Sequence, residues 1–304
     1  MIIFIEALVP IIALIALGYI LKKTKFLPNE VWLGLEKLTY FIFFPALLVH
    51  TIGTKSFAGI PIWDMFLVIC LTINIIAVIF IILRRKITED NATFTSIFQG
   101  GVRFNSYISL AIAYGLYGDN GLLLSSVSVG FIIVIANLWC VLVFVMWGEN
   151  SIKGVVPIIK AVFYNPLIIS CFLGLFLSAS NIEVNHVVVH ILKTIGSLTL
   201  PIGLLTIGAA LKIRQSKQYI EPIFYASFMQ FVIKPVLASI LVTWIGLSGV
   251  QAAVIIIAFI VPTASSSYIL AKQLGGNAKV MATIVTTQTM IAFMAMPILA
   301  ELLL

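Results

Sequence analysis

The sequence predicts an all-α membrane protein of ten transmembrane helices, built as two inverted five-helix halves, residues 1–150 and 151–304. Three observations predict this fold class. The apolar stretches are long enough to cross a bilayer, the basic residues lie in alternate loops, and lysine and proline positions recur between the halves. The chain is 62% hydrophobic and 10% charged, a composition that excludes a soluble globular protein.

The spans follow from the length of the apolar runs, since about twenty apolar residues cross the hydrocarbon layer as a helix. The runs are continuous rather than alternating, which excludes a transmembrane barrel. The loops are too short for a catalytic or nucleotide-binding domain, so we expect no enzyme activity, no cofactor and no metal. The predicted spans are 2–21, 31–53, 62–83, 93–117, 121–147, 155–179, 187–211, 219–245, 249–272 and 279–303.

Basic residues follow the odd-numbered spans, whereas the opposite loops contain only Lys55. Positive loops stay in the cytoplasm, so we expect a bacterial inner-membrane protein with both termini on the non-cytoplasmic side. The net charge of +7 therefore reflects topology and does not indicate nucleic-acid binding. The basic loop residues are Lys22, Lys23, Lys25, Arg84, Arg85, Lys86, Lys153, Lys212, Arg214, Lys217, Lys272 and Lys279.

The second and seventh spans share a pattern in which a lysine precedes a proline by eight residues. Lys37 and Pro45 carry it in the first half, and Lys193 and Pro201 carry it 156 residues later. An odd number of spans in each half makes the two halves inverted. Interrupted apolar segments at matching positions of two halves are typical of secondary transporters. We interpret Pro45 and Pro201 as kinks in a supporting element.

The fourth span is predicted to break near the middle of the membrane. Gly100 and Gly101 weaken the helix. The Arg103, Asn105 and Ser106 positions follow, and the amide and hydroxyl side chains can cap a new helical start.

The ninth span is predicted to break at Pro262, which removes a backbone donor and clashes with the preceding turn. The Thr and Ser residues after it can cap a second half-helix. Because the two spans run in opposite directions, their second halves should begin near one point and present two positive helix ends to an anion. The alternative is a proline kink whose free groups bond to neighbouring hydroxyls. The predicted substrate-binding residues are Arg103, Asn105, Ser106, Pro262, Thr263 and Ser265.

Four basic residues lie well inside the spans, whereas the acidic residues lie nearer the span ends. A charge at the bilayer centre costs about 3 kcal/mol, and an excess of buried positive charge suits an anionic substrate. For Lys37 and Lys193 the alternative is that the side chain reaches the interface. The four residues are Lys37, Arg103, Lys193 and Lys234.

Polar residues also occur in the tenth span. Thr287 and Gln288 could line the path to the site or bind a cation through their oxygens. Alternatively, they make hydrogen bonds between helices.

Motifs along the whole chain resemble the auxin efflux carrier family, whose bacterial members are often described as malate or malonate permeases. The order and spacing of these motifs carry the resemblance. They are Leu8-Val9-Pro10-Ile11, Leu17-Gly18-Tyr19, Leu35-Glu36-Lys37-Leu38, Phe44-Pro45-Ala46-Leu47-Leu48, Arg103-Phe104-Asn105, Pro201-Ile202-Gly203-Leu204-Leu205, Lys234-Pro235, Pro262-Thr263-Ala264 and Leu274-Gly275-Gly276-Asn277-Ala278.

The resemblance implies a fold similar to sodium/proton antiporters and bile acid–sodium symporters. Spans 1, 2, 6 and 7 would form a scaffold that often dimerises, and spans 3–5 and 8–10 a mobile transport unit. The family's crossover asparagine falls on Asn105 and its proline on Pro262. One departure is that plant members carry Asn-Pro-like pairs at both crossings, whereas Ser106 follows Asn105 here.

Together these observations predict a secondary transporter of a small organic anion, a mono- or dicarboxylate, working by elevator-type alternating access. The protein would contact lipid, form a homodimer through the scaffold, and use proton or sodium coupling, exchange or uniport. Two alternatives remain open. A sodium-coupled bile-acid-type symporter predicts sodium-dependent uptake, and a non-transporting membrane sensor or receptor predicts ligand binding without flux.

Overall fold

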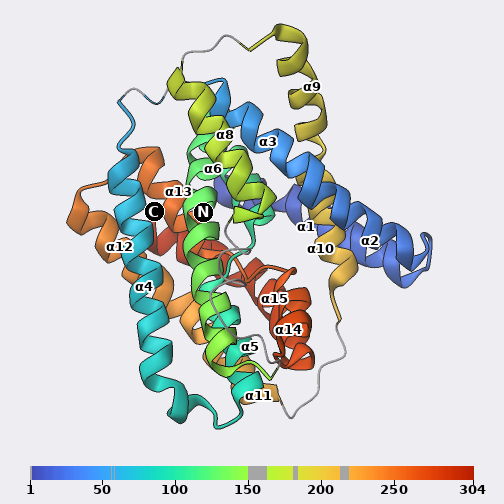
Figure 1. Cartoon of the computed structure of the whole chain (residues 1–304), viewed down its shortest axis with the longest axis vertical. Helices are drawn as coiled ribbons and strands as arrows, with labels where there is room; N and C mark the ends of the chain where they lie inside the picture. The colour runs from blue at the N-terminus through green and yellow to red at the C-terminus, as the bar shows by residue number, and fades with distance from the viewer. Residues whose placement is uncertain (1, 56, 58, 150–162, 181–183, 213–218) are drawn as a thin grey trace.

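The computed structural model describes residues 2–55, 57, 59–149, 163–180, 184–212 and 219–304, and all regular secondary structure in them is helical (Figure 1). Seven segments are long and apolar enough to cross a membrane, and one of them has 57 residues. Two shorter apolar helices accompany them. The prediction of an all-α, multi-pass membrane protein is confirmed. Lys153, Arg214, Lys217 and the first residues of the predicted sixth span, 155–162, lie outside the described residues.

The first half of the chain contains six α-helices and one short π-helix. Its longest helix, α6, bends at Gly118, whose backbone has φ 57° and ψ −143°. Glycine adopts such a conformation without steric cost, so two predicted spans join here through a turn. The elements are α1 (Ile2–Lys23), α2 (Asn29–Leu38), η1 (Thr39–Phe43), α3 (Phe44–Gly53), α4 (Ile62–Ile87), α5 (Asn91–Val102) and α6 (Ser106–Trp147).

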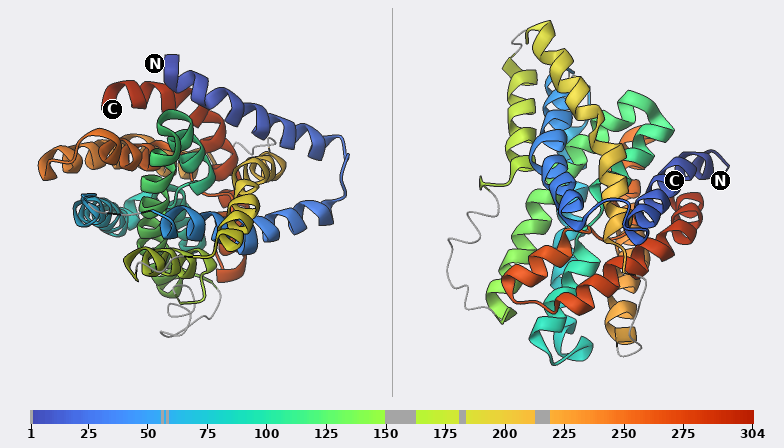
Figure 2. Two further views of the ribbon diagram at one scale, coloured as in Figure 1. Left: turned by 90° about the horizontal axis from the view of Figure 1, so that it is seen from above. Right: turned by 90° about the vertical axis from the view of Figure 1, so that its right-hand side faces the viewer.

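The second half also contains interrupted helices, and it ends near the start of the first half. The N- and C-terminal ends lie close together in both views of Figure 2. The elements are α8 (Pro166–Ser180), α9 (His186–Ser197), α10 (Thr199–Ala210), α11 (Ile220–Phe228), η3 (Met229–Ile233), α12 (Lys234–Ile245), α13 (Gly249–Ile260), α14 (Ser267–Leu274) and α15 (Ala278–Leu303).

Departures from α-helical geometry precede three prolines. The π-helix η1 comes just before Pro45, and η3 comes just before Pro235. The chain also bends at Leu198, between α9 and α10, three residues before Pro201. A proline ring clashes with the carbonyl four residues earlier, and an extra residue in that turn relieves the clash.

The helices pack in two groups. In one, α1 lies along α10, and α3 lies along α8 and α9. In the other, α5 packs on α11 and α15, α4 on α12, and α13 on α6. The crossing of α1 and α10 is close because Gly208 faces the backbone of α1. A Cβ atom on Gly208 would lie 1.9 Å from the Ile15 carbonyl oxygen.

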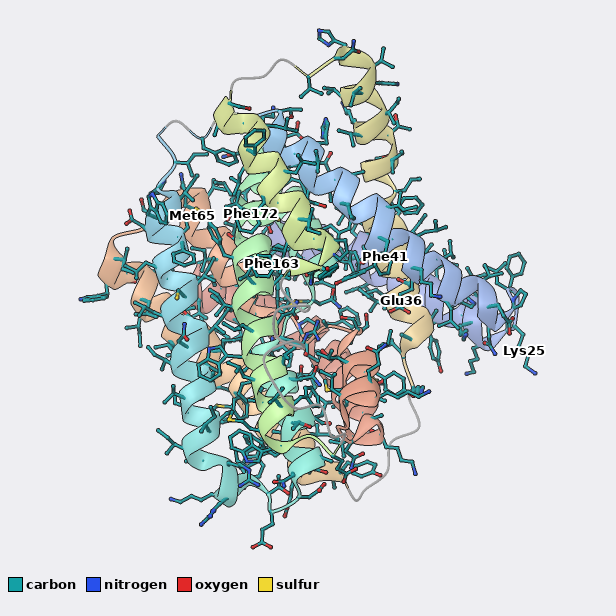
Figure 3. The ribbon with its side chains drawn as sticks, viewed as in Figure 1. Lys25, Glu36, Phe41, Met65, Phe163 and Phe172 are labelled. Atoms are coloured by element: carbon teal, nitrogen blue, oxygen red, sulfur yellow. The ribbon has the colours of Figure 1, made fainter. Side chains whose placement is uncertain are left out.

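The outer surface of the bundle carries large apolar side chains. Phe41 and Phe172, both labelled in Figure 3, are 60% and 65% exposed. By contrast, Met65 on α4 is fully buried. Apolar groups on the outside and tight packing inside are what a bilayer requires of a helical protein.

Candidate functional site

Two helices are interrupted at the predicted positions. Between α5 and α6, Arg103 has an extended backbone with φ −73° and ψ 166°. Between α13 and α14, Val261 is extended with φ −75° and ψ 156°. Both predicted interruptions, in the fourth and ninth spans, are therefore present.

The two interruptions lie against each other. The Asn105 backbone N–H donates to the Pro262 carbonyl at 2.8 Å. The Thr263 hydroxyl donates to the Gln99 carbonyl at 3.1 Å. The Arg103 guanidinium donates to the Gln99 side-chain oxygen and to the Ser266 hydroxyl, each at 3.4 Å. These contacts define what we call the crossing, the segments 99–107 and 261–267.

A glutamine on α15 joins both interrupted helices. The Gln288 amide nitrogen donates to the Gly100 carbonyl at 2.9 Å, and its oxygen accepts from the Thr263 N–H at 3.0 Å. Gln288 is fully buried. Its amide thus makes hydrogen bonds between helices, which was the alternative to lining a path to the site. Thr287, the next residue to it, is half-buried on the same helix.

A fully buried lysine completes the crossing from the side of α12. The Lys234 ammonium donates to the Arg103 carbonyl at 3.3 Å and to the side-chain oxygen of Gln230, one helical turn earlier. Gln230 in turn donates its amide to the Val261 carbonyl. Lys234 and Gln230 therefore donate hydrogen bonds to one carbonyl of each interruption. An ammonium is favoured there because carbonyl ends of helices carry partial negative charge.

The backbone N–H groups near the start of each new half-helix have fewer partners than the carbonyls described above. The Asn105 side chain accepts from the Ile108 N–H at 3.3 Å, as predicted for a cap. Within the described chain, no hydrogen bond is made by the backbone N–H groups of Ser106 and Tyr107, at the start of α6, or of Ser265 and Ser266, in the turn before α14. The first N–H groups inside α14 are bonded to the carbonyls of that turn. The crossing therefore supplies donors to several of its carbonyls and leaves these four N–H groups free for an anion.

A buried hydroxyl adds to these free donors. Ser267, the first residue of α14, is fully buried, and its hydroxyl has no partner in the described part of the protein. A buried polar group without a partner costs about 1–3 kcal/mol. A ligand that accepts from this hydroxyl would remove that cost.

The predicted binding residues differ in exposure. Asn105, Pro262 and Thr263 are buried, whereas Arg103, Ser106 and Ser265 are half-buried. The interpretation of the threonine after Pro262 as a cap is wrong. The Thr263 hydroxyl does not cap α14, because it bonds across to the other interrupted helix. The residue at the N-cap is Ser266, whose side chain makes no cap bond.

Sequence reasoning missed several partners in the crossing. Gln99 and Gln230 were not singled out, and Lys234 was recognised only as a deep charge. The available signal was the spacing of four residues between Gln230 and Lys234, which places both side chains on one helix face.

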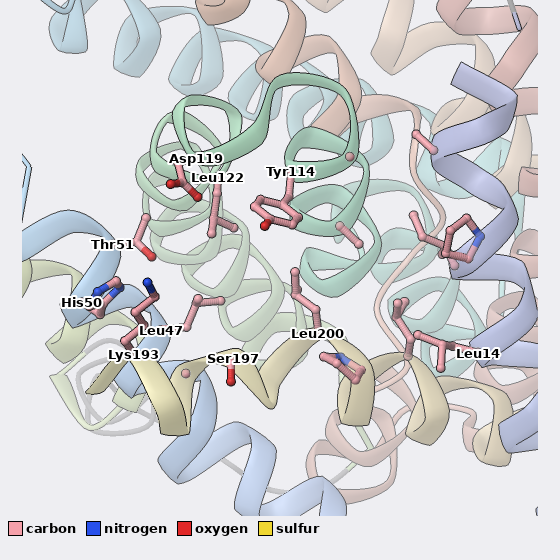
Figure 4. A pocket seen from close by; sticks show the side chains of 18 of the residues that line it. Leu14, Leu47, His50, Thr51, Tyr114, Asp119, Leu122, Lys193, Ser197 and Leu200 are labelled. Atoms are coloured by element: carbon pink, nitrogen blue, oxygen red, sulfur yellow. The ribbon is translucent and has the colours of Figure 1, made fainter. Parts of the chain in front are cut away.

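A large cavity lies beside the crossing, between the two groups of helices (Figure 4). Its volume is about 1160 Å³, and its walls come from α1, α3, α6, α9 and α10. None of the six predicted substrate-binding residues lines it. The closest approach along α6 is Ala111, five residues after Ser106, which corresponds to about 7.5 Å of helix.

Tyr107, the last residue of the first crossing segment, packs against α3 and α10. Its ring lies 5.1 Å from the Phe44 ring, centre to centre. A Cβ atom on Gly203 would lie 2.7 Å from the Tyr107 ring. Leu47, one turn after Phe44, and Leu204, which follows Gly203, line the cavity. The Tyr107 ring therefore packs against two of the helices that line the cavity.

The sequence profile of a family described as "Membrane transport protein" matches residues 3–155 and 154–300. The chain belongs to this family. It is the auxin efflux carrier family that the motifs indicated. The chain is also 18% identical over 296 residues, 96% of each sequence, to an "Uncharacterized transporter" of Methanothermobacter thermautotrophicus. This membrane transport protein is therefore a transporter and not an enzyme.

Proposed function

We propose that this transporter carries a small organic anion, a mono- or dicarboxylate, which binds at the crossing of the fourth and ninth spans. The observation that supports this best is the asymmetry of the crossing. Carbonyls of Arg103, Val261 and Pro262 have donors from the protein, whereas amides of Ser106 and Ser265 are free. Free backbone amides at or just before the start of a half-helix can bind a carboxylate.

The charges at the crossing favour the same substrate. Its hydrogen bonds use amide, hydroxyl, guanidinium and ammonium groups, with Arg103 and Lys234 supplying the charges. Positive groups in a low-dielectric site attract an anion more strongly than they would in water. Arg103 is half-buried beside Ser266, within reach of an anion held by the free amides.

Alternating access is the proposed mechanism. The two packing groups correspond to a scaffold of spans 1, 2, 6 and 7 and a transport unit of spans 3–5 and 8–10. The interruption after Val102 matches the one after Ile260, and the bend before Pro45 matches the one before Pro201. These matches support ten spans in two inverted halves. We further propose that both termini lie on the non-cytoplasmic side of a bacterial inner membrane and that the protein forms a dimer through the scaffold.

We propose that transport does not require sodium. Sodium would need oxygen ligands at the carbonyl ends of the interrupted helices. There, the Arg103 and Val261 carbonyls already accept from Lys234 and Gln230, and the Gln288 oxygen accepts from Thr263. The Lys234 ammonium thus fills the position a metal cation would take. A sodium-coupled symporter predicts that uptake stops when choline replaces sodium; our proposal predicts unchanged uptake.

The test is uptake of labelled mono- and dicarboxylates into proteoliposomes. Pro262→Ala restores a backbone donor and lets α13 continue, so we expect uptake to fall about a hundredfold. Pro297→Ala is the matched control, because Pro297 lies inside the continuous helix α15. Binding of a carboxylate without any flux would favour the sensor alternative, and equal uptake by both variants would overturn the crossing as the site.

A further inference from the structure

Polar groups gather at one end of the cavity. His50 and Thr51 come from α3 and Lys193 comes from α9. Figure 4 shows the Thr51 hydroxyl and the Lys193 ammonium pointing toward the same part of the cavity. His50 lies close enough to Lys193 for the two to interact electrostatically.

Two of these groups lack partners. Thr51 is only 6% exposed, and its hydroxyl makes no hydrogen bond in the described chain. Across the described ranges, Lys193 makes neither a hydrogen bond nor an ion pair, although its side chain is exposed to the cavity. The buried Thr51 hydroxyl without a partner is costly, and the exposed Lys193 ammonium is available to a ligand.

A negative charge lies at the same end of the cavity (Figure 4). Asp119 lies on α6, just after the bend at Gly118, and it also interacts electrostatically with His50. Much of the remaining wall is apolar, with Leu47, Leu122 and Leu200 lining the space, and Glu6 on α1 is the other acidic residue of the lining. One end of the cavity thus combines the positive and hydroxyl groups with the Asp119 carboxylate close to them.

We propose that Lys193, His50 and Thr51 form a docking site for one carboxylate, and that Asp119 selects against a second negative group on the same molecule. The inference rests on the proposed transport of organic anions, and it adds a preference for monocarboxylates with an apolar body.

The chemistry of each group supports this assignment. The lysine supplies a point charge, while the imidazole N–H and the threonine hydroxyl supply directed donors to carboxylate oxygens. Apolar walls with a few convergent polar groups are the usual construction of a small-molecule site. A dicarboxylate would place its second charge nearer Asp119, where repulsion in a partly desolvated space lowers its affinity.

The first experiment measures the charge of the cavity without relying on transport. Ser197 lines the cavity one turn after Lys193, so Ser197→Cys reports on this end. An anionic and a cationic methanethiosulfonate reagent are compared, with the parent chain as blank for Cys70, Cys140 and Cys171.

We expect the anionic reagent to react faster with Ser197→Cys. Adding Lys193→Gln should lower the ratio of the two rates about tenfold, because the loss of one nearby charge acts on both reagents with opposite sign. Lys55→Gln, which removes the other lysine of the cavity, is the control and should change the ratio less. Equal effects of the two variants, or no preference for the anionic reagent, would overturn the docking site.

The second experiment uses butyrate and malonate as probes that protect Ser197→Cys from labelling. Butyrate should protect at several-fold lower concentration than malonate, and Asp119→Asn should remove most of that difference. No protection by either probe, or better protection by malonate, would refute the proposal. Labelling requires no flux, so a functional docking site with no carboxylate uptake would instead count against the proposed transport.

Discussion

The crossing and the cavity differ in how they treat their polar groups. At the crossing, Lys234 and Gln288 are fully buried, and their hydrogen bonds join them to carbonyl, N–H and side-chain amide groups around the interruptions. In the cavity, Lys193 has no such partner within the described residues, and the Thr51 hydroxyl is orphaned. The protein thus builds a bonded, rigid framework around the free N–H groups of the crossing, whereas Lys193 and Thr51 in the cavity have no such framework.

This difference separates two tasks. A bound anion needs donors held in fixed positions, so the interrupted helices must not shift or rewind. An access route needs groups that attract an anion and then release it, which a fully bonded network cannot do. Substitutions at the crossing should therefore change both stability and transport, whereas substitutions in the cavity should change transport alone.

The largest effect is expected for Lys234→Met, which keeps the length of the side chain and removes the charge. It leaves the Arg103 carbonyl and the Gln230 oxygen without their donor. At about 1–3 kcal/mol for each orphaned group, unfolding in detergent should occur at a clearly lower temperature, and uptake should fall about a hundredfold. Lys37→Met is the control, because Lys37 is exposed. Matching stability of the two variants would contradict a structural role for Lys234.

Asn105→Ala should have the next largest effect. It removes the cap on the Ile108 N–H, which costs about 1 kcal/mol, and it also removes a predicted substrate contact. The matched control is Asn185→Ala, since Asn185 caps the exposed helix α9 through the Val187 N–H at 2.8 Å. Both variants should lose similar stability in a thermal unfolding assay, and only Asn105→Ala should lose carboxylate uptake. Equal uptake would mean that Asn105 is only a cap.

A smaller effect is expected for Gly203→Ala, at the contact between α10 and α6. The new methyl group would meet the Tyr107 ring, and such overpacking costs about 1–3 kcal/mol. If Tyr107 closes the path from the cavity, the maximal uptake rate should change more than the apparent affinity. Gly34→Ala is the control, because nothing lies within 4 Å of a Cβ there, and it should be neutral or slightly stabilising. Unchanged stability and uptake of Gly203→Ala would show that the contact between Gly203 and the Tyr107 ring is loose.

The smallest effect on stability is expected for Lys193→Gln in the cavity. The unfolding temperature should stay within error of the parent, because the lysine has no partner to lose within the described chain. The concentration for half-maximal uptake should rise several-fold when substrate is added from the cavity side only. A large loss of stability would show that the cavity is part of the rigid framework, and the comparison would fail.

Local signals in the sequence predicted the interruptions well. The Gly100-Gly101 pair and Asn105 predicted the first break, and Pro262 predicted the second, because these residues act on the backbone within one turn. The apolar runs predicted an all-helical membrane protein for the same reason. Both are properties of short segments, and neither depends on which helices become neighbours.

Long-range partners could not be predicted in this way. The contact between Lys234 and the Arg103 carbonyl spans 131 residues, and the bond from Gln288 to Gly100 spans 188. The Thr263 hydroxyl was misassigned because its partner, the Gln99 carbonyl, comes from the other interrupted helix. The cavity at Lys193 likewise depends on five helices, α1, α3, α6, α9 and α10, which meet only in the folded protein.

The most direct test of the central claim is to locate a bound carboxylate in an experimental structure, using a bromine-substituted carboxylate whose position the heavy atom marks. Our account predicts carboxylate oxygens within hydrogen-bond distance of the free N–H groups of Ser106 and Ser265 or Ser266, beside Arg103. A carboxylate bound elsewhere while these amides remain unoccupied, or a cation seated at the crossing, would contradict it.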